Sequence, residues 1–397
     1  MRLIFIDHQE KGLEFLRPEV LTAALRQHAA MAVFVSGKSE PNPWGVAAGM
    51  ADASTARLLS PDTPLRVASN TKTFVAATVL RLWEQGVIPL DAPIGSLLAP
   101  TLERLLSSRG YRTDKMTVRH LLSHSAGVYD HADDPRYFKA VLADPTHHWT
   151  REEQVGLSCR YAGPTSEPGQ RYKYSDTGYV LLGDIVERVT QAPLARSVRH
   201  QLRLDERGLA STWWELVESQ PAQTQARARQ FLDDDAATDV TDLSATLDLY
   251  GGGGLVMSVR DLATFHQDLF EHRVFDNPAT LAEMLRRGEH EGAEEYRLGI
   301  SVKRVGGREC YSHAGFWGTA VYYSPDAGVS IAGFTTHRAS RPALVAVLED
   351  AVRAAALGLA SGCRDGHHVD GFVEVHNDPP KIANGCDGFA ARNNVCD

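Results

Sequence analysis

Long apolar runs, a surplus of basic residues and a signal segment are all missing from this sequence. No run of about 18 consecutive apolar residues occurs, which excludes a membrane-spanning helix. Lysine and arginine number 41 against 50 acidic residues, for a net charge of -9, and they form no basic stripe of the kind that binds nucleic acid or anionic membranes. The apolar run at Leu3 to Ile6 is shorter than the core of a secretory signal. We therefore expect a cytoplasmic protein whose partner is a small-molecule substrate, with no nucleic-acid or membrane partner.

Cysteine is also scarce, and its five copies do not suggest a disulfide framework, because the number is odd and no export signal is seen. Cys159 and Cys310 stand alone in the body of the chain, and the remaining three lie in the tail 361–397. That tail also contains three histidines, which raises the possibility of a metal site. Their spacing fits no Cys/His ligand pattern, so we predict no metal and a loosely ordered appendage.

The main body of the chain has strand-forming sequence at both of its ends. The runs 31–37 and 44–51, joined by "KSEPNP", predict a β-hairpin at the edge of a sheet. The stretch 308–336 predicts successive strands that include the turn "SPDAG", and 343–357 predicts a strong helix. With 43% hydrophobic residues, a chain of 397 residues can bury a large core.

The middle of the chain is helical in pattern. Residues 69–85 are apolar almost all round, which predicts a buried helix opened by Ser69 and ended by Gly86. Ser258 precedes another helix as an N-cap, three positions before an acidic residue. Residues 179–190 are amphipathic, with one apolar face (Leu182, Ile185, Val186, Val189) and one polar face (Asp184, Glu187, Arg188).

These elements together predict an α+β fold, in which an antiparallel β-sheet is flanked by helices with a helical subdomain beside it. We predict one catalytic domain over residues 1–360, with the helical subdomain at about 90–250 inserted between the sheet segments. The tail 361–397 then follows this domain.

The stretch "RVASNTKTF" places Ser69 three residues before Lys72. Residues three apart share a helix face, so the lysine amine can reach the serine hydroxyl. A hydroxyl is a weak nucleophile until a base takes its proton, and burial lowers the pKa of an amine enough for that role. The motif alone is weak, and a solvated lysine is the competing interpretation.

Two further motifs strengthen the catalytic interpretation. "YKYSDTGY" places Tyr174 and Asp176 on either side of Ser175, and "YSHAGFWG" contains His313, Ala314 and Gly315. In this order, the trio "ASNTK", "YSD" and "HAG" resembles the serine β-lactamase and DD-peptidase superfamily, in the branch of class C β-lactamases, D-alanyl-D-alanine carboxypeptidases, D-aminopeptidases and β-lactamase-like esterases. The stretches "VRHLLSHSAGV", "TGYVLLGDIVERVT" and "GGGGLVMSVRDLATF" add to this resemblance, which runs from about residue 30 to 355.

The resemblance implies a role for each catalytic residue. Ser69 would attack a carbonyl and become acylated, while Lys72 and Tyr174 share the proton transfer. The backbone N–H groups of Ser69 and Phe316 would form the oxyanion hole. His313 would lie across the pocket and hydrogen-bond towards Tyr174 or a substrate carboxylate. No cofactor is implied.

The resemblance also implies a substrate-binding set, which comprises Asp176, Ala314, Gly315 and Phe316. Asp176 stands where the family most often has Asn, and would face Lys72 and the amide side of the substrate. If both groups are charged, Asp176 would hold Lys72 protonated and move the role of base to Tyr174. A histidine at 313 in place of lysine makes the site less positive near pH 7, which disfavours strong β-lactamase activity.

Structural interpretations remain open beside the catalytic ones. Tyr174 and His313 could be buried side chains with satisfied hydrogen bonds, and Asp176 could be a helix N-cap. His120 and His124 lie four apart like zinc ligands, but no third ligand is evident, so structural roles are predicted for them.

The favoured function is a serine hydrolase acting on small amides or peptides, of the D-aminopeptidase or D-alanyl-D-alanine carboxypeptidase type, or on esters. A β-lactamase-like carboxylesterase is the alternative, followed by a weak β-lactamase or a non-catalytic penicillin-binding protein. An ordinary α/β-hydrolase is excluded because G-x-S-x-G does not occur.

Overall fold

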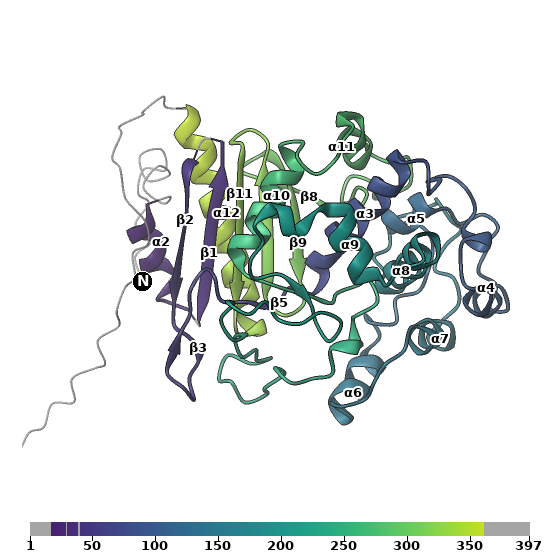
Figure 1. Cartoon of the computed structure of the whole chain (residues 1–397), viewed down its shortest axis with the longest axis horizontal. Coiled ribbons are helices and arrows are strands. Elements are labelled where there is room, and N and C mark those ends of the chain that lie inside the picture. The colour runs from purple at the N-terminus through teal and green to yellow at the C-terminus, as the bar shows by residue number, and fades with distance from the viewer. Residues whose placement is uncertain (1–16, 29, 39, 361–397) are drawn as a thin grey trace, which may run out of the picture.

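The computed structural model describes residues 17–28, 30–38 and 40–360. The tail 361–397, for which the sequence suggests a loosely ordered appendage, lies outside these residues. A large sheet occupies one side of the molecule and most of the helices gather on the other (Figure 1). This is the predicted α+β fold with an antiparallel sheet flanked by helices.

The large sheet is antiparallel and joins the two ends of the chain. Its strand order is β2-β1-β11-β10-β9-β8, so the first hairpin pairs directly with the last one, with Met31 opposite Thr335. The strands are β1 (Met31–Gly37), β2 (Glu40–Ala48), β8 (Ser301–Val305), β9 (Arg308–Gly315), β10 (Thr319–Ser324) and β11 (Val329–Thr335).

The predicted edge hairpin of β1 and β2 is present, with different bounds for its second strand. β2 begins at Glu40, so Pro41 and Pro43 lie within it. Proline is tolerated there because β2 is the outermost strand of the sheet. The predicted turn "SPDAG" joins β10 to β11, where the N–H of Gly328 donates to the carbonyl of Ser324 at 2.8 Å.

Alternating side chains of the sheet belong to two separate cores. Met31, Val33 and Val35 of β1 pack with the helix α12 (Arg341–Ala360) and with α2 (Pro18–Leu25). Ala32 and Phe34 point to the opposite face and join the main core. That face is covered by α10 (Val259–Phe270), which begins at the predicted N-cap Ser258.

Most of the helices beside the sheet lie within the range of about 90–250 given for the helical subdomain, whereas α3 (Thr71–Glu84) precedes this range and α11 (Pro278–Leu285) follows it. The helices within it are α4 (Pro100–Ser107), α5 (Val118–Leu122), α6 (Pro135–Ala143), α7 (Arg151–Tyr161), α8 (Asp176–Thr190) and α9 (Leu194–Leu202). Short 3-10 turns lie at Ala68–Asn70 (η1), Ile94–Ser96, Leu204–Arg207, Ala245–Leu247 and Arg338–Ser340. Within the described ranges, no helix combines the length and the apolar character needed to cross a bilayer.

The helix α8 differs from its predicted polar face at one position. Asp184 is 5% exposed, and its carboxylate accepts a hydrogen bond from the N–H of Ala99 at 2.7 Å. Neighbouring elements therefore cover this side of α8 as well as its apolar side. The amphipathic pattern did not indicate this because it treats every charged residue as exposed.

A small three-stranded sheet positions the candidate site. Its order is β5 (Leu65–Arg66), β7 (Leu255–Met257) and β6 (Trp213–Trp214), with Arg66 paired to Val256. The chain leaves β5 directly into the turn that contains Ser69, and β7 directly follows the glycine run 251–254. This pairing brings two segments that are far apart in sequence to the same place.

Candidate active site

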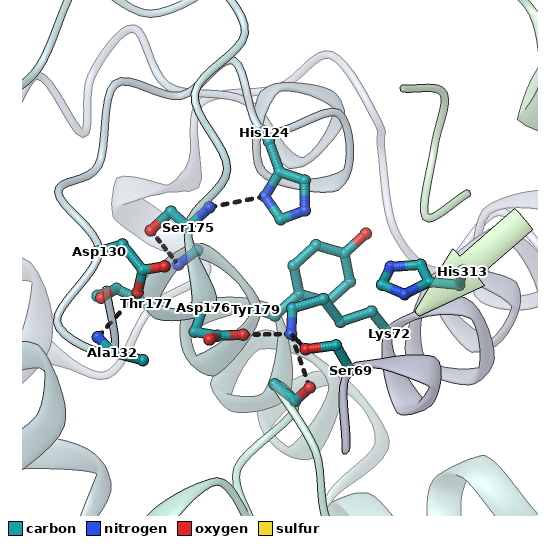
Figure 2. A network of polar contacts seen from close by, with 12 residues as sticks. Ser69, Lys72, His124, Asp130, Ala132, Ser175, Asp176, Thr177, Tyr179 and His313 are labelled. Carbon is teal, nitrogen blue, oxygen red and sulfur yellow. Dashed lines mark hydrogen bonds and ion pairs between the residues drawn. The ribbon is translucent and has the colours of Figure 1, made fainter. Parts of the chain in front are cut away.

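Ser69 lies at the junction between β5 and the buried helix α3. It does not open the helix itself, as the sequence suggests, but lies in the 3-10 turn η1 just before it. Ala68 has φ +47, a left-handed conformation that prevents the helix from continuing backwards through it. Lys72 is in the first turn of α3, and its Nζ donates to Ser69 Oγ at 2.9 Å (Figure 2).

The ammonium group of Lys72 is enclosed by acceptors. Its side chain is fully buried, and besides Ser69 it contacts the carbonyl of Gly252 at 2.7 Å and the carboxylate of Asp176. An ammonium group carries three N–H donors, so these three acceptors match its protonated form. The predicted contact of Asp176 with Lys72 is therefore present.

Asp176 is not the N-cap of α8, which was the structural interpretation left open for it. The cap is Ser175, whose side chain accepts from the N–H of Gly178 at 3.2 Å. Asp176 is the first helical residue, and its side chain is 24% exposed. Its carboxylate is thus free of the capping role and faces the lysine.

The glycine run allows the chain to approach Lys72 closely. A Cβ on Gly251 would lie 2.4 Å from the carbonyl oxygen of Tyr179, and one on Gly254 would lie 2.5 Å from Trp214 Nε1. Both glycines also have φ above +100°. Only glycine fits these positions, and the result is that the carbonyl of Gly252 reaches the lysine.

Tyr174 completes the group around Ser69. Its ring centroid lies 5.1 Å from Lys72 Nζ. Burial holds the pKa of the Tyr174 phenol well above its usual value, the negative charge of Asp176 raises it further, and a hydrogen bond with Ser69 opposes the shift. The structure therefore brings Ser69, Lys72 and Tyr174 together, with Tyr174 as a neutral phenol.

His313 lies on β9 at the far side of the group, 3% exposed (Figure 2). Its Nε2 is 2.9 Å from the hydroxyl of Tyr296, whereas its ring centroid is 6.5 Å from that of Tyr174. The expected hydrogen bond to Tyr174 is thus replaced by one to Tyr296. Tyr296 is 1% exposed, and its ring packs between those of Tyr174 and His313. Burial, with a smaller effect from the Lys72 charge, lowers the pKa of His313 to about 3.

The end of β9 approaches the turn of Ser69. A Cβ on Gly315 would lie 2.3 Å from the carbonyl oxygen of Val67, so only glycine allows this contact. Phe316 follows immediately, with its ring 5.3 Å from that of Phe138, while Ala314 is exposed. The placement suits the oxyanion hole predicted from the N–H groups of Ser69 and Phe316, which stays a prediction.

Two carboxyl groups near Lys72 were not found from the sequence. Burial raises the pKa of Asp130 to about 8, with a further effect from Asp176, and burial raises the pKa of Asp248 to about 7. Asp130 accepts a hydrogen bond from the N–H of Ala132 at 3.0 Å. Asp176 contacts the lysine directly, and the charge of Lys72 also influences Asp130 and Asp248.

The histidines of "HLLSH" have distinct environments. His120 Nδ1 accepts from the N–H of Thr117 at the start of α5, and His124 Nδ1 accepts from the N–H of Ser175. Over the ranges that the structure describes, no group of three or more His, Cys, Asp or Glu side chains is arranged to hold a metal ion.

Comparison with known proteins shows which family the chain belongs to. A sequence model described as Beta-lactamase matches residues 21–356. The chain belongs to the Beta-lactamase family. The resemblance seen in "ASNTK", "YSD" and "HAG", at about residues 30 to 355, is thereby confirmed.

Two solved structures and one curated relative illustrate the range of this Beta-lactamase family. The D-amino acid amidase of Ochrobactrum anthropi SV3, solved with L-phenylalanine amide, superposes with a TM-score of 0.70 at 22% identity, over 84% of this chain and 97% of that one. A D-stereospecific amidohydrolase from a Streptomyces species gives a TM-score of 0.66 at 25% identity, over 81% and 95%. Esterase EstB of Burkholderia gladioli is 33% identical over 156 residues, which are only 38% of this chain and 39% of the esterase.

Proposed function

We propose that this protein is a serine hydrolase that works through an acyl-enzyme. The observation that carries the proposal is the contact between Lys72 Nζ and Ser69 Oγ beside the Tyr174 phenol. In the first step Ser69 Oγ bonds to a substrate carbonyl carbon, and the bond to the leaving group breaks. The serine proton passes through the Lys72 and Tyr174 pair to the leaving amine or alcohol. Water then attacks the ester carbonyl, the bond to Ser69 Oγ breaks, and the same groups pass a proton from the water to Ser69 as the acid is released.

The charge state of the site suggests how the proton leaves Ser69. Lys72 contacts three acceptors, and Tyr174 is a neutral phenol, so neither resting group can accept a proton. When a substrate ammonium takes the place of Lys72 beside the Asp176 carboxylate, Lys72 can lose a proton to water, and the neutral amine beside Ser69 can then act as the base. Tyr174 then gives its proton to the leaving group and takes the serine proton from Lys72.

The carboxyl groups suggest the substrate class. We infer that the acyl part carries a protonated amine next to the scissile carbonyl, as in D-amino-acid amides and peptides. The amine nitrogen of such a substrate lies about 2.5 Å from the attacked carbon. Ser69 Oγ and the partly exposed Asp176 carboxylate both contact Lys72 Nζ, so they lie close together. A substrate ammonium group next to the carbonyl that Ser69 attacks would therefore lie beside the Asp176 carboxylate. His313 is neutral above about pH 3, so it offers no charge to a substrate carboxylate.

A labelling experiment tests the reaction type. The protein is incubated with a fluorophosphonate, and the intact mass and the modified peptide are measured. One adduct at Ser69, absent in Ser69→Ala, is expected. A folded wild type that forms no adduct would refute the serine-hydrolase proposal, and a non-catalytic penicillin-binding protein would then be favoured.

A substrate panel tests the substrate class. D-alanine p-nitroanilide is compared with its N-acetyl derivative, which differs by loss of the positive charge, and with p-nitrophenyl butyrate and nitrocefin. We expect kcat/KM for the free amine to exceed that for the acetylated compound by about tenfold or more. Equal values would refute the inference about the amine while leaving the serine mechanism intact.

A carboxylesterase is the second candidate, because EstB, to which this chain is 33% identical over the matched residues, is described as an esterase. Butyrate hydrolysis with no measurable anilide hydrolysis would favour this candidate. Rapid nitrocefin turnover would favour a β-lactamase instead.

A further inference from the structure

Tyr174 is held on both sides by one residue, His124. The N–H of Lys173 donates to the His124 carbonyl at 2.8 Å, and the N–H of Ser175 donates to His124 Nδ1 at 3.1 Å. The residues immediately before and after Tyr174 are therefore both bonded to His124. Figure 2 shows the second of these bonds, with the imidazole above the active-site group.

The imidazole of His124 also packs on the phenol of Tyr174. Their ring centroids are 4.1 Å apart with an interplanar angle of 35°. The other face and edges of the imidazole meet Tyr179 at 5.0 Å and Tyr296 at 4.6 Å. His124 is 2% exposed, so this packing leaves the ring little freedom to move.

The hydrogen bonds fix the protonation state of His124. Because Nδ1 accepts from Ser175, the proton of the neutral ring is on Nε2, a buried atom that has no hydrogen-bond partner among the described residues. Burial, and then the charge of Lys72, holds the pKa of His124 well below its usual value. The residue also adopts φ +55, a left-handed conformation that is uncommon for residues other than glycine, although histidine adopts it more often than most. An unsatisfied donor and a strained backbone both cost stability, which is unexpected for a residue whose role is only to support the fold.

We propose that His124 is a positioning residue for Tyr174. It fixes the phenol against Ser69 through one ring contact and two hydrogen bonds from the flanking N–H groups, one to its carbonyl and one to its Nδ1. This inference rests on the proposed serine-hydrolase function, because Tyr174 has its role only in that reaction. His124 itself does not contact the substrate. Displacing a catalytic group by about 1 Å can reduce a rate by about 100-fold, so the restraint is large enough to matter.

The variant His124→Asn separates the ring from the hydrogen bonds. Asparagine keeps a side-chain acceptor near the position of Nδ1, keeps the backbone carbonyl and tolerates a positive φ, but it lacks the ring. His266→Asn is the matched control. His266 is fully buried, and its Nδ1 lies 3.1 Å from the Leu262 carbonyl within its own helix.

The measurement is a double-mutant cycle with Tyr174→Phe, in which the rate of fluorophosphonate labelling at Ser69 is followed by intact mass. In the wild-type background, His124→Asn is expected to slow labelling by about 10- to 100-fold. In the Tyr174→Phe background, it is expected to slow labelling by less than about threefold, because the hydroxyl that it positions is already absent. His266→Asn should have no such coupling in either background.

Several outcomes would overturn the proposal. Equal slowing in both backgrounds, or slowing no greater than that of the control, would show that His124 does not act through Tyr174. If His124→Asn does not fold, the cycle is repeated with His124→Phe, which keeps a ring against the phenol and loses the acceptor. If neither variant folds, His124 is required for the fold, and the proposal is wrong. Wild type that does not label at all would refute the proposed function instead, so the two failures are distinguishable.

Discussion

Lys72 and Gly252 are 180 residues apart in sequence, yet the lysine ammonium donates to the glycine carbonyl at 2.7 Å. The contact depends on a glycine run in which Gly251 and Gly254 have no room for a side chain. The nucleophile and its lysine are only three residues apart in sequence, but their geometry is completed by this distant segment. The glycine run is therefore as important for the site as the S-x-x-K motif itself.

Gly254→Ala is expected to reduce both stability and activity. The new Cβ would lie 2.5 Å from Trp214 Nε1 at φ +115, so the segment must shift and move the Gly252 carbonyl. We expect a loss of about 2 kcal/mol or more in the free energy of unfolding, together with a reduced kcat. Gly86→Ala is the control, because Gly86 also has a positive φ but no atom within 4 Å of its Cβ position. Denaturant unfolding should give a loss of only about 1 kcal/mol for this variant, and equal losses would contradict the steric explanation.

Lys72→Ala is expected to reduce kcat/KM by about 1,000-fold or more, because Ser69 loses the group that accepts its proton. The protein should remain folded, since the Asp176 side chain is 24% exposed and can be solvated when its partner is removed. Steady-state kinetics and far-UV circular dichroism together make the test. Activity equal to wild type in a folded Lys72→Ala protein would overturn the assigned role.

Asp176→Asn is expected to alter the acidic limb of the pH profile of kcat/KM. The carboxylate places a negative charge against Lys72, whereas an asparagine side chain carries none, so the charge balance around Lys72 changes. The same variant should lower the preference for D-alanine p-nitroanilide over its N-acetyl derivative. An acidic limb identical to wild type would refute the idea that Asp176 controls the charge of Lys72.

Asp130→Asn is expected to change how stability depends on pH. Folding raises the pKa of Asp130 from 3.8 to about 8, so between these values the native state holds a proton that the unfolded chain has released. Stability from this group therefore decreases as pH rises, by about 1 kcal/mol between pH 7 and pH 8. The lowered pKa of His313 acts in the opposite sense, but only below about pH 6.5.

Urea unfolding of wild type and Asp130→Asn at pH 7 and pH 8 measures this difference. The variant should lose less stability than the wild type over the interval, since asparagine keeps the acceptor for the Ala132 N–H without a titrating group. Parallel losses in the two proteins would show that Asp130 is not the group responsible.

Local sequence signals predicted the elements of the fold and the core of the candidate site. Alternation and turn residues indicated the strands at both ends, and Ser258 indicated the start of a helix. The three motifs indicated residues that the structure brings together, with Ser69, Asp176 and Tyr174 around one lysine. Such signals succeed because each depends on residues close together in the chain.

Other features depend on tertiary contacts that local patterns do not contain. Asp130 and Tyr296 come from irregular segments and reach the site only after the chain has folded around it. Asp184 is charged, yet it is buried against a neighbouring backbone N–H. The start of α3 was misplaced because the left-handed Ala68 has no sequence signal.

The most direct test of the account is the fluorophosphonate adduct measured in parallel on wild type, Ser69→Ala and Lys72→Ala. Intact mass and peptide mapping should show a single adduct on Ser69 in the wild type, none in Ser69→Ala, and labelling at least about 100-fold slower in Lys72→Ala. Modification of folded wild type at any other residue, or equally rapid labelling without the lysine, would contradict the claim that Lys72 activates Ser69.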